Sequence, residues 1–176
     1  MPERMKSVAS VLIVEDEGVL RLALKHALVK EGHTAVTAPD YPQGLVKFTQ
    51  EEFAVCLLGI ELDGGSGLEL LRRARQQEPD VKCVMLTATP NADTAAEAVR
   101  LGAFDYLVKP VVVKNVLRVV RLALENRRLE EERNRYAERV DRYRRNLEAV
   151  FNSVNDGILV LDAALRIRQA NQAFTA

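Results

Sequence analysis

Acidic, hydroxyl and basic side chains stand at the ends of separate apolar runs in this sequence. Glu15 and Asp16 follow residues 8–14. Thr87 follows residues 82–86, and Lys109 follows residues 104–108. Carboxylate oxygens are preferred ligands of hard cations such as Mg²⁺, whereas hydroxyl and ammonium groups bind the oxygens of anions. The run at residues 53–58 is followed by Gly59, which has no side chain to contribute.

Five apolar runs are predicted to be the β-strands that position these side chains: residues 8–14, 34–38, 53–58, 82–86 and 104–108. The first, third and fourth runs are almost continuously apolar, which is typical of strands covered by helices on both faces. Stretches of helical periodicity separate the runs, so the sequence predicts an α/β fold with a doubly wound, five-stranded parallel sheet and five helices. Ligand sites in such sheets lie at the carboxyl ends of the strands. The residues expected there are Glu15, Asp16, Gly59, Thr87, Ala88, Lys109 and Pro110.

Residues with capping side chains or restricted backbones predict the helix boundaries. The first helix should end at Gly32, which accepts the left-handed backbone conformation. Asp40, Ser66 and Asp93 should cap the second, third and fourth helices, because their side-chain oxygens accept hydrogen bonds from free backbone N–H groups. Pro79 closes the third helix, and the fourth is expected to end near residue 102.

Residues 111–150 contain no Gly or Pro and are rich in Arg and Glu, which predicts one long helix. Its apolar stripe recurs at alternating spacings of three and four, the pattern of a coiled coil. We call this stripe the seam; it consists of Val119, Leu122, Asn126, Leu129, Arg133, Tyr136, Val140, Tyr143, Leu147 and Val150. So narrow a stripe is best covered by a second copy of the same helix, so we expect a homodimer.

The charges beside the seam bear on how stable this dimer is. Asn126 occupies a position where Asn fixes a parallel, two-stranded register. In that register Glu125 would face Glu130 and Arg139 would face Arg144, and these like charges repel. The sequence therefore predicts a parallel dimer of marginal stability. The alternative is a solvated single helix docked on its own domain.

Four segments of the chain resemble the signature segments of receiver domains in two-component signalling: VLIVEDE, LLGIELDGGSGLELL, VMLTA and GAFDYLVKP. The resemblance to this CheY-like family extends from residue 8 to about residue 125 and implies the flavodoxin-like strand order 2-1-3-4-5. In that family an acidic pair binds Mg²⁺, and an Asp at the end of the third strand accepts a phosphoryl group. A hydroxyl group binds a phosphoryl oxygen, and a Lys, usually joined to Pro by a cis bond, neutralises its charge.

The resemblance assigns a role to each matching residue of this chain. Glu15 and Asp16 match the acidic pair, Thr87 the hydroxyl and Lys109 the lysine. Tyr106 matches the aromatic residue that swings inward on activation. The resemblance therefore implies a receiver pocket that differs from the family at the phosphoacceptor position.

Gly59 stands where the family has its phosphorylated Asp, so orthodox phosphotransfer cannot run at this position. Glu61 and Asp63 lie in the following loop, where strand alternation and the loop path should aim their side chains elsewhere. The sequence disfavours both as substitute acceptors. No resident cofactor is expected, because Mg²⁺ would be held only weakly by Glu15 and Asp16 with backbone and water.

Without its usual partner, Lys109 needs a new counter-charge, and Glu15 and Asp16 are within reach. The hypothesis is that the pairing of Lys109 with Glu15 or Asp16 holds the edge of the sheet in one conformation whether or not a phosphodonor is present. The preferred function is then a phosphorylation-independent receiver that dimerises and relays a signal. An active receiver with a non-standard acceptor is the alternative.

The segment LEAVFNSVNDGILVLDAALRIRQANQAF resembles the start of a PAS sensory domain, which typically opens with a helix, a D-G-I strand and an N-x-A-F segment. It is too short to bury a core, so it should be poorly ordered or pair with its copy in the dimer. The predicted organisation is a receiver core at residues 1–112, a coiled-coil signalling helix at 113–150 and the start of a PAS domain at 151–176. The chain itself is not expected to be an enzyme. A longer protein of this type would carry an output domain, such as a histidine kinase, a diguanylate cyclase or an AAA+ transcription activator.

Composition narrows the expected partners and compartment. Lys and Arg number 25, as do Asp and Glu, so no net charge favours nucleic acid or a membrane surface. A nucleic-acid-binding helix remains a third possibility, disfavoured because Glu residues interleave with Arg127, Arg128, Arg135, Arg142 and Arg145. Neither a membrane span nor a secretory signal is visible, so the expected compartment is the cytoplasm and the expected partners are other signalling proteins. Cys56 and Cys83 lie in apolar runs and are predicted to be buried free thiols.

Overall fold

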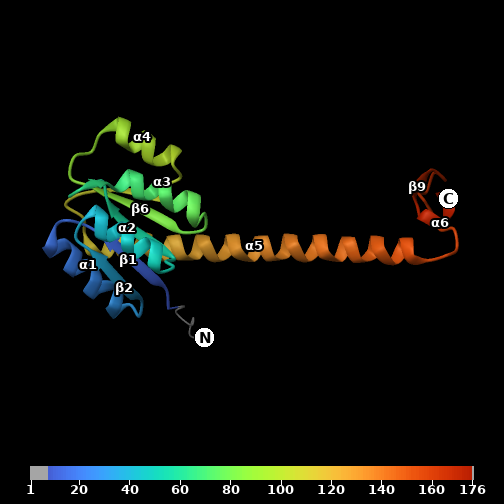
Figure 1. The fold of residues 1–176 in the computed structure, drawn as a ribbon, viewed down its shortest axis with the longest axis horizontal. Coiled ribbons are helices and arrows are strands. Elements are labelled where there is room, and N and C mark those ends of the chain that lie inside the picture. Colours follow the sequence, from blue (N-terminus) through green and yellow to red (C-terminus); the bar gives the residue numbers. More distant parts are fainter. Residues whose placement is uncertain (1–7, 176) are drawn as a thin grey trace. The chain divides into compact units, whose positions relative to one another are not determined.

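A computed structural model describes residues 8–175 of the chain. It divides into two compact units, with the boundary between Arg128 and Leu129 (Figure 1). The first unit holds the predicted sheet and its helices. The second holds the rest of the long helix and a small hairpin.

The first unit is built on a five-stranded parallel sheet with the order β2-β1-β3-β6-β7. Its strands are β1 (Ser10–Val14), β2 (Thr34–Ala38), β3 (Val55–Gly59), β6 (Lys82–Thr87) and β7 (Asp105–Val108). The order is the predicted 2-1-3-4-5 arrangement once the short strands β4 and β5 are set aside. All five strands begin within two residues of the predicted runs, so the predicted fold is confirmed.

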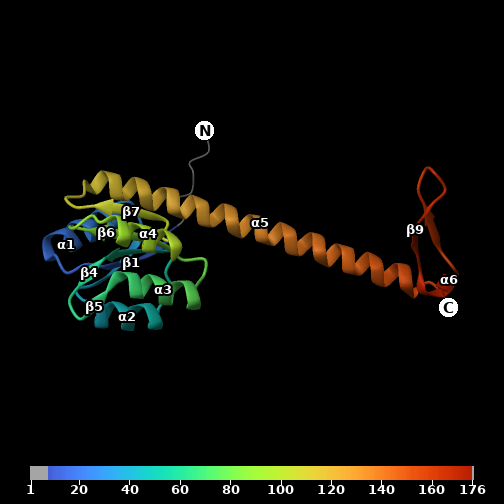
Figure 2. The same cartoon turned by 90° about the horizontal axis from the view of Figure 1, so that it is seen from above.

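Helices cover both faces of this sheet, as doubly wound topology requires. They are α1 (Gly18–Lys30), α2 (Tyr41–Gln50), α3 (Gly67–Gln77), α4 (Ala92–Arg100) and α5 (Val113–Ser153). Side chains from α2, α3 and α4 form one core with one face of the sheet, and side chains from α1 and α5 form the other. Figure 2 shows α2 and α3 on one side of the sheet and the start of α5 on the opposite side. Cys56 and Cys83 are buried free thiols on β3 and β6, as predicted.

The predicted helix boundaries agree with the structure except for one cap, which is wrong. Gly32 has the left-handed φ of 91° after α1. The side chains of Asp40 and Ser66 accept hydrogen bonds from the first turns of α2 and α3. The cap of α4 is Asn91, not Asp93, because the Asn91 Oδ1 atom accepts the Asp93 N–H at 2.7 Å. Asp93 therefore lies within the first turn of α4.

A hairpin that the sequence analysis did not predict follows β3. Its strands are β4 (Glu61–Leu62) and β5 (Gly65–Ser66), which pair antiparallel. The hairpin leads directly into α3, and the Gly67 N–H donates to the Ile60 carbonyl at 2.9 Å. A Cβ atom at Gly67 would lie 1.9 Å from the Gly59 carbonyl oxygen, so only glycine allows this close approach.

The second unit contains a two-stranded hairpin after the end of α5. β8 (Leu159–Leu161) and β9 (Ile167–Ala170) pair antiparallel, followed by the short α6 (Gln172–Thr175). Each strand therefore has its partner in the same chain, and the pairing with a second copy offered by the sequence analysis is not needed. The Asn171 side chain is buried and donates to the carbonyls of Phe151, Val154 and Asp156, which fixes the end of α5 to the hairpin.

The long helix is confirmed, and its seam begins later than predicted. Val119 is only 1% exposed because it packs in the core beside the sheet, so its assignment to the seam is wrong. Arg133 is exposed and Asn126 is partly buried. The apolar members beyond Val119 are between 49% and 68% exposed: Leu122, Leu129, Tyr136, Val140, Tyr143, Leu147 and Val150.

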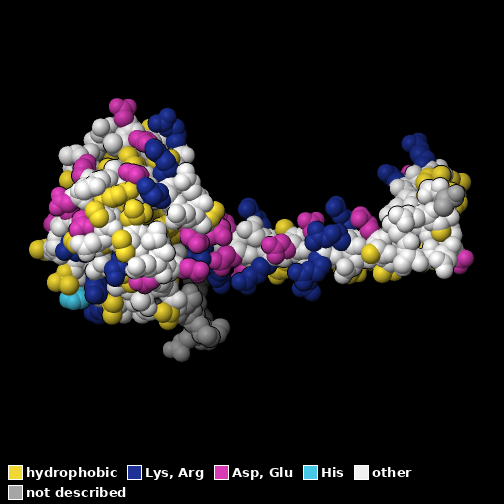
Figure 3. Space-filling view, viewed as in Figure 1, with side chains coloured by type: hydrophobic (Ala, Val, Ile, Leu, Met, Phe, Trp, Pro, Cys, Tyr) yellow, Lys and Arg dark blue, Asp and Glu magenta, His cyan; other side chains and the backbone are white. Residues whose placement is uncertain are grey.

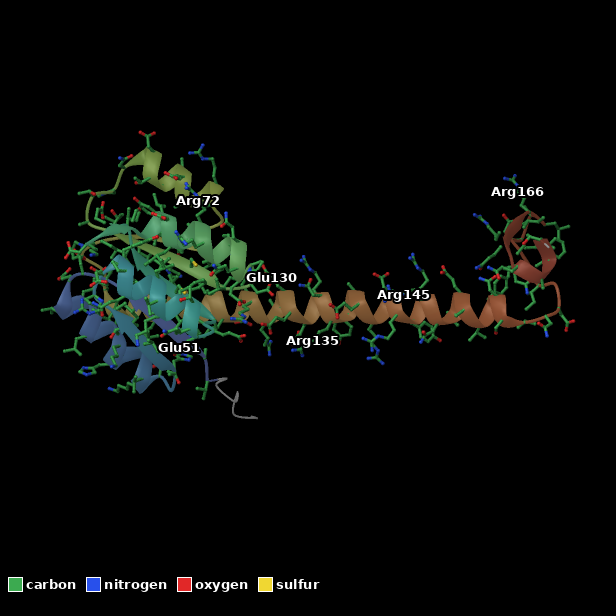
Figure 4. All side chains as sticks on the ribbon, in the orientation of Figure 1. Glu51, Arg72, Glu130, Arg135, Arg145 and Arg166 are labelled. Atoms are coloured by element: carbon green, nitrogen blue, oxygen red, sulfur yellow. The ribbon has the colours of Figure 1, made fainter. Side chains whose placement is uncertain are left out.

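Charged side chains surround the exposed part of α5. Basic and acidic groups alternate along it in Figure 3, and Arg135 and Arg145 project outward from the helix in Figure 4. This mixture of signs is that of a solvated helix face. Within residues 8–175, no helix is both long enough and apolar enough to cross a membrane.

Candidate functional site

The carboxyl edge of the sheet brings together the acidic pair and the lysine. The Lys109 Nζ atom lies 2.5 Å from the Glu15 Oε1 atom and 4.0 Å from the Asp16 Oδ1 atom. Glu15 is fully buried, whereas the Asp16 side chain is 44% exposed. The predicted pairing of Lys109 with an acidic neighbour is therefore observed, and Glu15 is its main partner.

Burial determines the electrostatics of this pair. Loss of solvation raises the pKa of the Glu15 carboxyl, and the hydrogen bond from Lys109 acts against that rise. The neighbouring Glu15 side chain lowers the pKa of Asp16, and the charge of Lys109 lowers it further. The Glu15 Oε2 atom is buried without a hydrogen-bond partner. The buried carboxyl therefore depends on Lys109 for its compensation.

An arginine that the sequence analysis missed also supports the acidic pair. The Arg21 Nη1 atom donates to the carbonyl oxygens of Glu15 at 2.5 Å and Asp16 at 3.1 Å. Arg21 lies in the first turns of α1, where its guanidinium group reaches back over the end of β1. No motif marks this residue, because it binds backbone atoms rather than side chains.

Gly59 closes β3 beside the buried Glu15 carboxyl. A Cβ atom at this position would lie 3.3 Å from the Glu15 Oε2 atom and 3.0 Å from the Leu62 Cδ2 atom. Both neighbours are side-chain atoms, so shifts of a few tenths of an ångström in Leu62 and Glu15 would admit a larger residue. The space at the phosphoacceptor position therefore persists although the carboxylate is missing.

Thr87 is bound by Glu61, a residue that the sequence analysis expected to point elsewhere. The Thr87 Oγ1 atom lies 3.3 Å from both oxygens of the Glu61 carboxylate. The Thr89 hydroxyl donates to the Glu61 Oε1 atom as well. The expectation for Glu61 is wrong because the residues after β3 form a hairpin rather than an irregular loop, and this hairpin turns Glu61 back over the edge of the sheet.

The remaining predicted residues lie beside this cluster. Ala88 and Pro110 are exposed, and the bond between Lys109 and Pro110 is cis, as the resemblance implied. Tyr106 is partly buried, and its hydroxyl lies 3.1 Å from the Thr94 Oγ1 atom of α4. The structure thus brings the acidic pair, Lys109, Thr87 and Gly59 to one edge, with Tyr106 on the neighbouring strand.

The donor set fits a divalent cation poorly. One oxygen of Glu15 is already bound by Lys109, and Gly59 supplies no third carboxylate. Among the described residues, no group of three or more His, Cys, Asp and Glu side chains is placed to hold a metal ion. A cation at this edge would therefore have to displace the Lys109 ammonium group or bind beside it.

Comparison with known proteins agrees with this fold. Residues 11–121 match the response regulator receiver domain family, and residues 145–176 match the PAS domain family. The chain therefore belongs to the response-regulator receiver family of two-component signalling. The PAS match covers the end segment where the sequence resembled the start of such a domain.

Two curated relatives show how far the similarity extends. The chain is 36% identical over 100 residues to the alginate biosynthesis transcriptional regulatory protein AlgB of Pseudomonas aeruginosa, covering 57% of this chain and 22% of that protein. It is 35% identical over 121 residues to the response regulator protein PilR of the same species, covering 69% of this chain and 27% of PilR. The matched part thus spans about a quarter of the length of these relatives.

Solved structures agree with the fold. A CheY-like receiver domain protein from Methanospirillum hungatei aligns with a TM-score of 0.68 at 29% identity, covering 70% of this chain and 99% of that chain. NtrX from Brucella abortus, solved in complex with ATP, aligns with a TM-score of 0.67 at 32% identity, covering 72% of this chain and 29% of NtrX. Both similarities support the receiver fold of the first unit.

Proposed function

We propose that this chain is a phosphorylation-independent receiver that dimerises through α5 and relays a signal to a following PAS or output domain. The observation that carries this proposal is Gly59 at the phosphoacceptor position. A glycine supplies no carboxylate to form an acyl phosphate. The proposal extends the family assignment from the fold to the mode of action.

The interactions of Lys109 and Thr87, the other groups of the pocket, support this proposal. In a phosphoaccepting site the lysine and the hydroxyl must be able to bind phosphoryl oxygens. Here Lys109 is paired with the buried Glu15 carboxyl, and Thr87 is bound to Glu61. These groups are compensated within the chain, so the pocket needs neither a phosphoryl group nor Mg²⁺ to hold its conformation.

The exposed seam supports the proposed homodimer. Seven apolar side chains from Leu122 to Val150 recur along α5 and are about half exposed or more in the single chain. Burying such a stripe against a second copy removes apolar surface from water. A parallel dimer would carry a shift of the receiver along α5 to the PAS domain. We place this relay in the cytoplasm, acting on other signalling proteins.

Titration calorimetry with Mg²⁺ and beryllofluoride tests the independence from phosphate. Beryllofluoride is the probe because it binds a phosphoacceptor carboxylate as a phosphoryl group would. We expect no binding of beryllofluoride and only weak binding of Mg²⁺, since Gly59 offers neither ligand a carboxylate. Micromolar binding of both would overturn the proposal and favour a non-standard acceptor.

A further inference from the structure

Glu61 contacts the two hydroxyl groups that stand where the sheet meets α4. Its carboxylate accepts hydrogen bonds from Thr87 and Thr89, which lie 26 and 28 residues further along the chain. We propose that Glu61 is an internal anionic ligand of the Thr87 hydroxyl and locks the segment between β6 and α4 in one conformation. This inference rests on the proposed function, in which no phosphoryl group reaches Thr87.

The local sequence explains how Glu61 arrives there. Ile60 and Leu62 are buried, and Glu61 between them is exposed. Alternation along the extended backbone therefore sends the two apolar side chains into the core and Glu61 to the opposite side. The pairing of Glu61 with Ser66 in the hairpin and the Ile60 N–H bond to the Leu86 carbonyl at 2.8 Å fix this segment against β6.

The Thr87 hydroxyl both donates and accepts a hydrogen bond in this arrangement. Its hydroxyl donates to Glu61 and accepts the Thr89 backbone N–H at 3.1 Å. Thr87 is completely buried, so its hydroxyl requires a partner within the protein. A carboxylate is the strongest such partner available, because hydrogen bonds to a charged acceptor are stronger than those to a neutral one.

The same segment continues into the first turn of α4. Asn91 caps that turn, and the Thr94 hydroxyl contacts both the Asn91 carbonyl at 3.0 Å and the Tyr106 hydroxyl at 3.1 Å. Residues 87–94 thus connect Glu61 to Tyr106 through contacts within the first unit. Holding Thr87 and Thr89 therefore restricts the start of α4 and the surroundings of Tyr106.

Amide hydrogen exchange of the intact chain tests this lock. Glu61→Ala removes the carboxylate, and we expect exchange at residues 88–94 to become about tenfold faster, with the Thr89 N–H most affected. Glu61→Gln keeps an acceptor oxygen without the charge, so its effect should be smaller. Asp63→Asn is the matched control, since Asp63 is an exposed acid in the same hairpin.

Exchange in β1 and β3 reports whether each variant is folded, and it should remain as in the parent protein. If exchange at residues 88–94 in the folded Glu61→Ala variant stays within about twofold of the parent, the lock does not exist. An equal acceleration in Asp63→Asn would also overturn it, because the effect would then belong to the hairpin as a whole. Neither result bears on Gly59. The proposed function is contradicted by a different result, such as a phosphorylated parent protein.

Discussion

The carboxyl edge of the sheet and the exposed stripe of α5 differ in whether their side chains find partners within the chain. At the edge, Lys109 is paired with Glu15, and Thr87 is paired with Glu61. Along α5, apolar side chains such as Val140 and Tyr143 have two thirds of their surface exposed. At the edge the lysine and the hydroxyl have partners within the chain, whereas the apolar side chains of the stripe are largely exposed in the single chain.

This difference indicates where the molecule receives and passes on its signal. A pocket whose charges are already paired is a poor receiver of a new charge. An uncovered apolar stripe on a continuous helix is suited to association. The working surface of this protein is therefore expected on α5 and not at the former phosphoacceptor.

The largest effect is expected from Lys109→Met, which leaves the buried Glu15 carboxyl without its cation. Removing one partner of a buried ion pair costs about 3 kcal/mol or more, so the free energy of unfolding should fall by about that amount. Urea denaturation at neutral pH measures it. Lys114→Met, at an exposed position of α5, is the control and should change little.

Adding Glu15→Gln to Lys109→Met sharpens this test. The double variant has no buried charge, so it should recover most of the stability that Lys109→Met loses. If Lys109→Met is as stable as the parent, the pairing with Glu15 does not hold the edge together.

A smaller effect is expected from Val140→Asp, which places a charge in the seam. Burying an uncompensated carboxylate should weaken the homodimer by about 2 kcal/mol, or roughly thirtyfold in the dissociation constant. Sedimentation equilibrium measures this change. Asn134→Asp adds the same charge off the seam and should leave association nearly unchanged. A parent protein that stays monomeric at about 100 μM would contradict the proposed homodimer, because its free energy of association would then be weaker than about −5.5 kcal/mol.

The smallest effect concerns the α4 cap beside the pocket. Asn91→Ala removes the side-chain acceptor of the first turn and should lower the free energy of unfolding by about 1 kcal/mol. Asp93→Ala, which removes the residue favoured by the sequence, should cost less. Thermal or urea unfolding of the two variants distinguishes them, and a larger loss in Asp93→Ala would reassign the cap.

The strands and the residues at their carboxyl ends were predictable from local pattern, whereas the strand order and the roles of the acidic pair came from the family resemblance. The continuous apolar runs marked the buried strands, and parallel topology placed Glu15 and Lys109 at one edge. Glu61 could not be placed, because its direction depends on the pairing of β4 with β5, and strands of two residues carry no detectable periodicity. Val119 was misassigned because heptad spacing continues through the part of α5 that packs on the sheet.

The most direct measurement is the intact mass of the parent protein and of Gly59→Asp after incubation with acetyl phosphate and Mg²⁺. The parent should gain no phosphoryl mass. Gly59→Asp should gain one, because Glu15, Asp16 and Lys109 remain at the edge and the new Cβ needs only small shifts of the Leu62 and Glu15 side chains. A phosphorylated parent protein would contradict the phosphorylation-independent receiver outright.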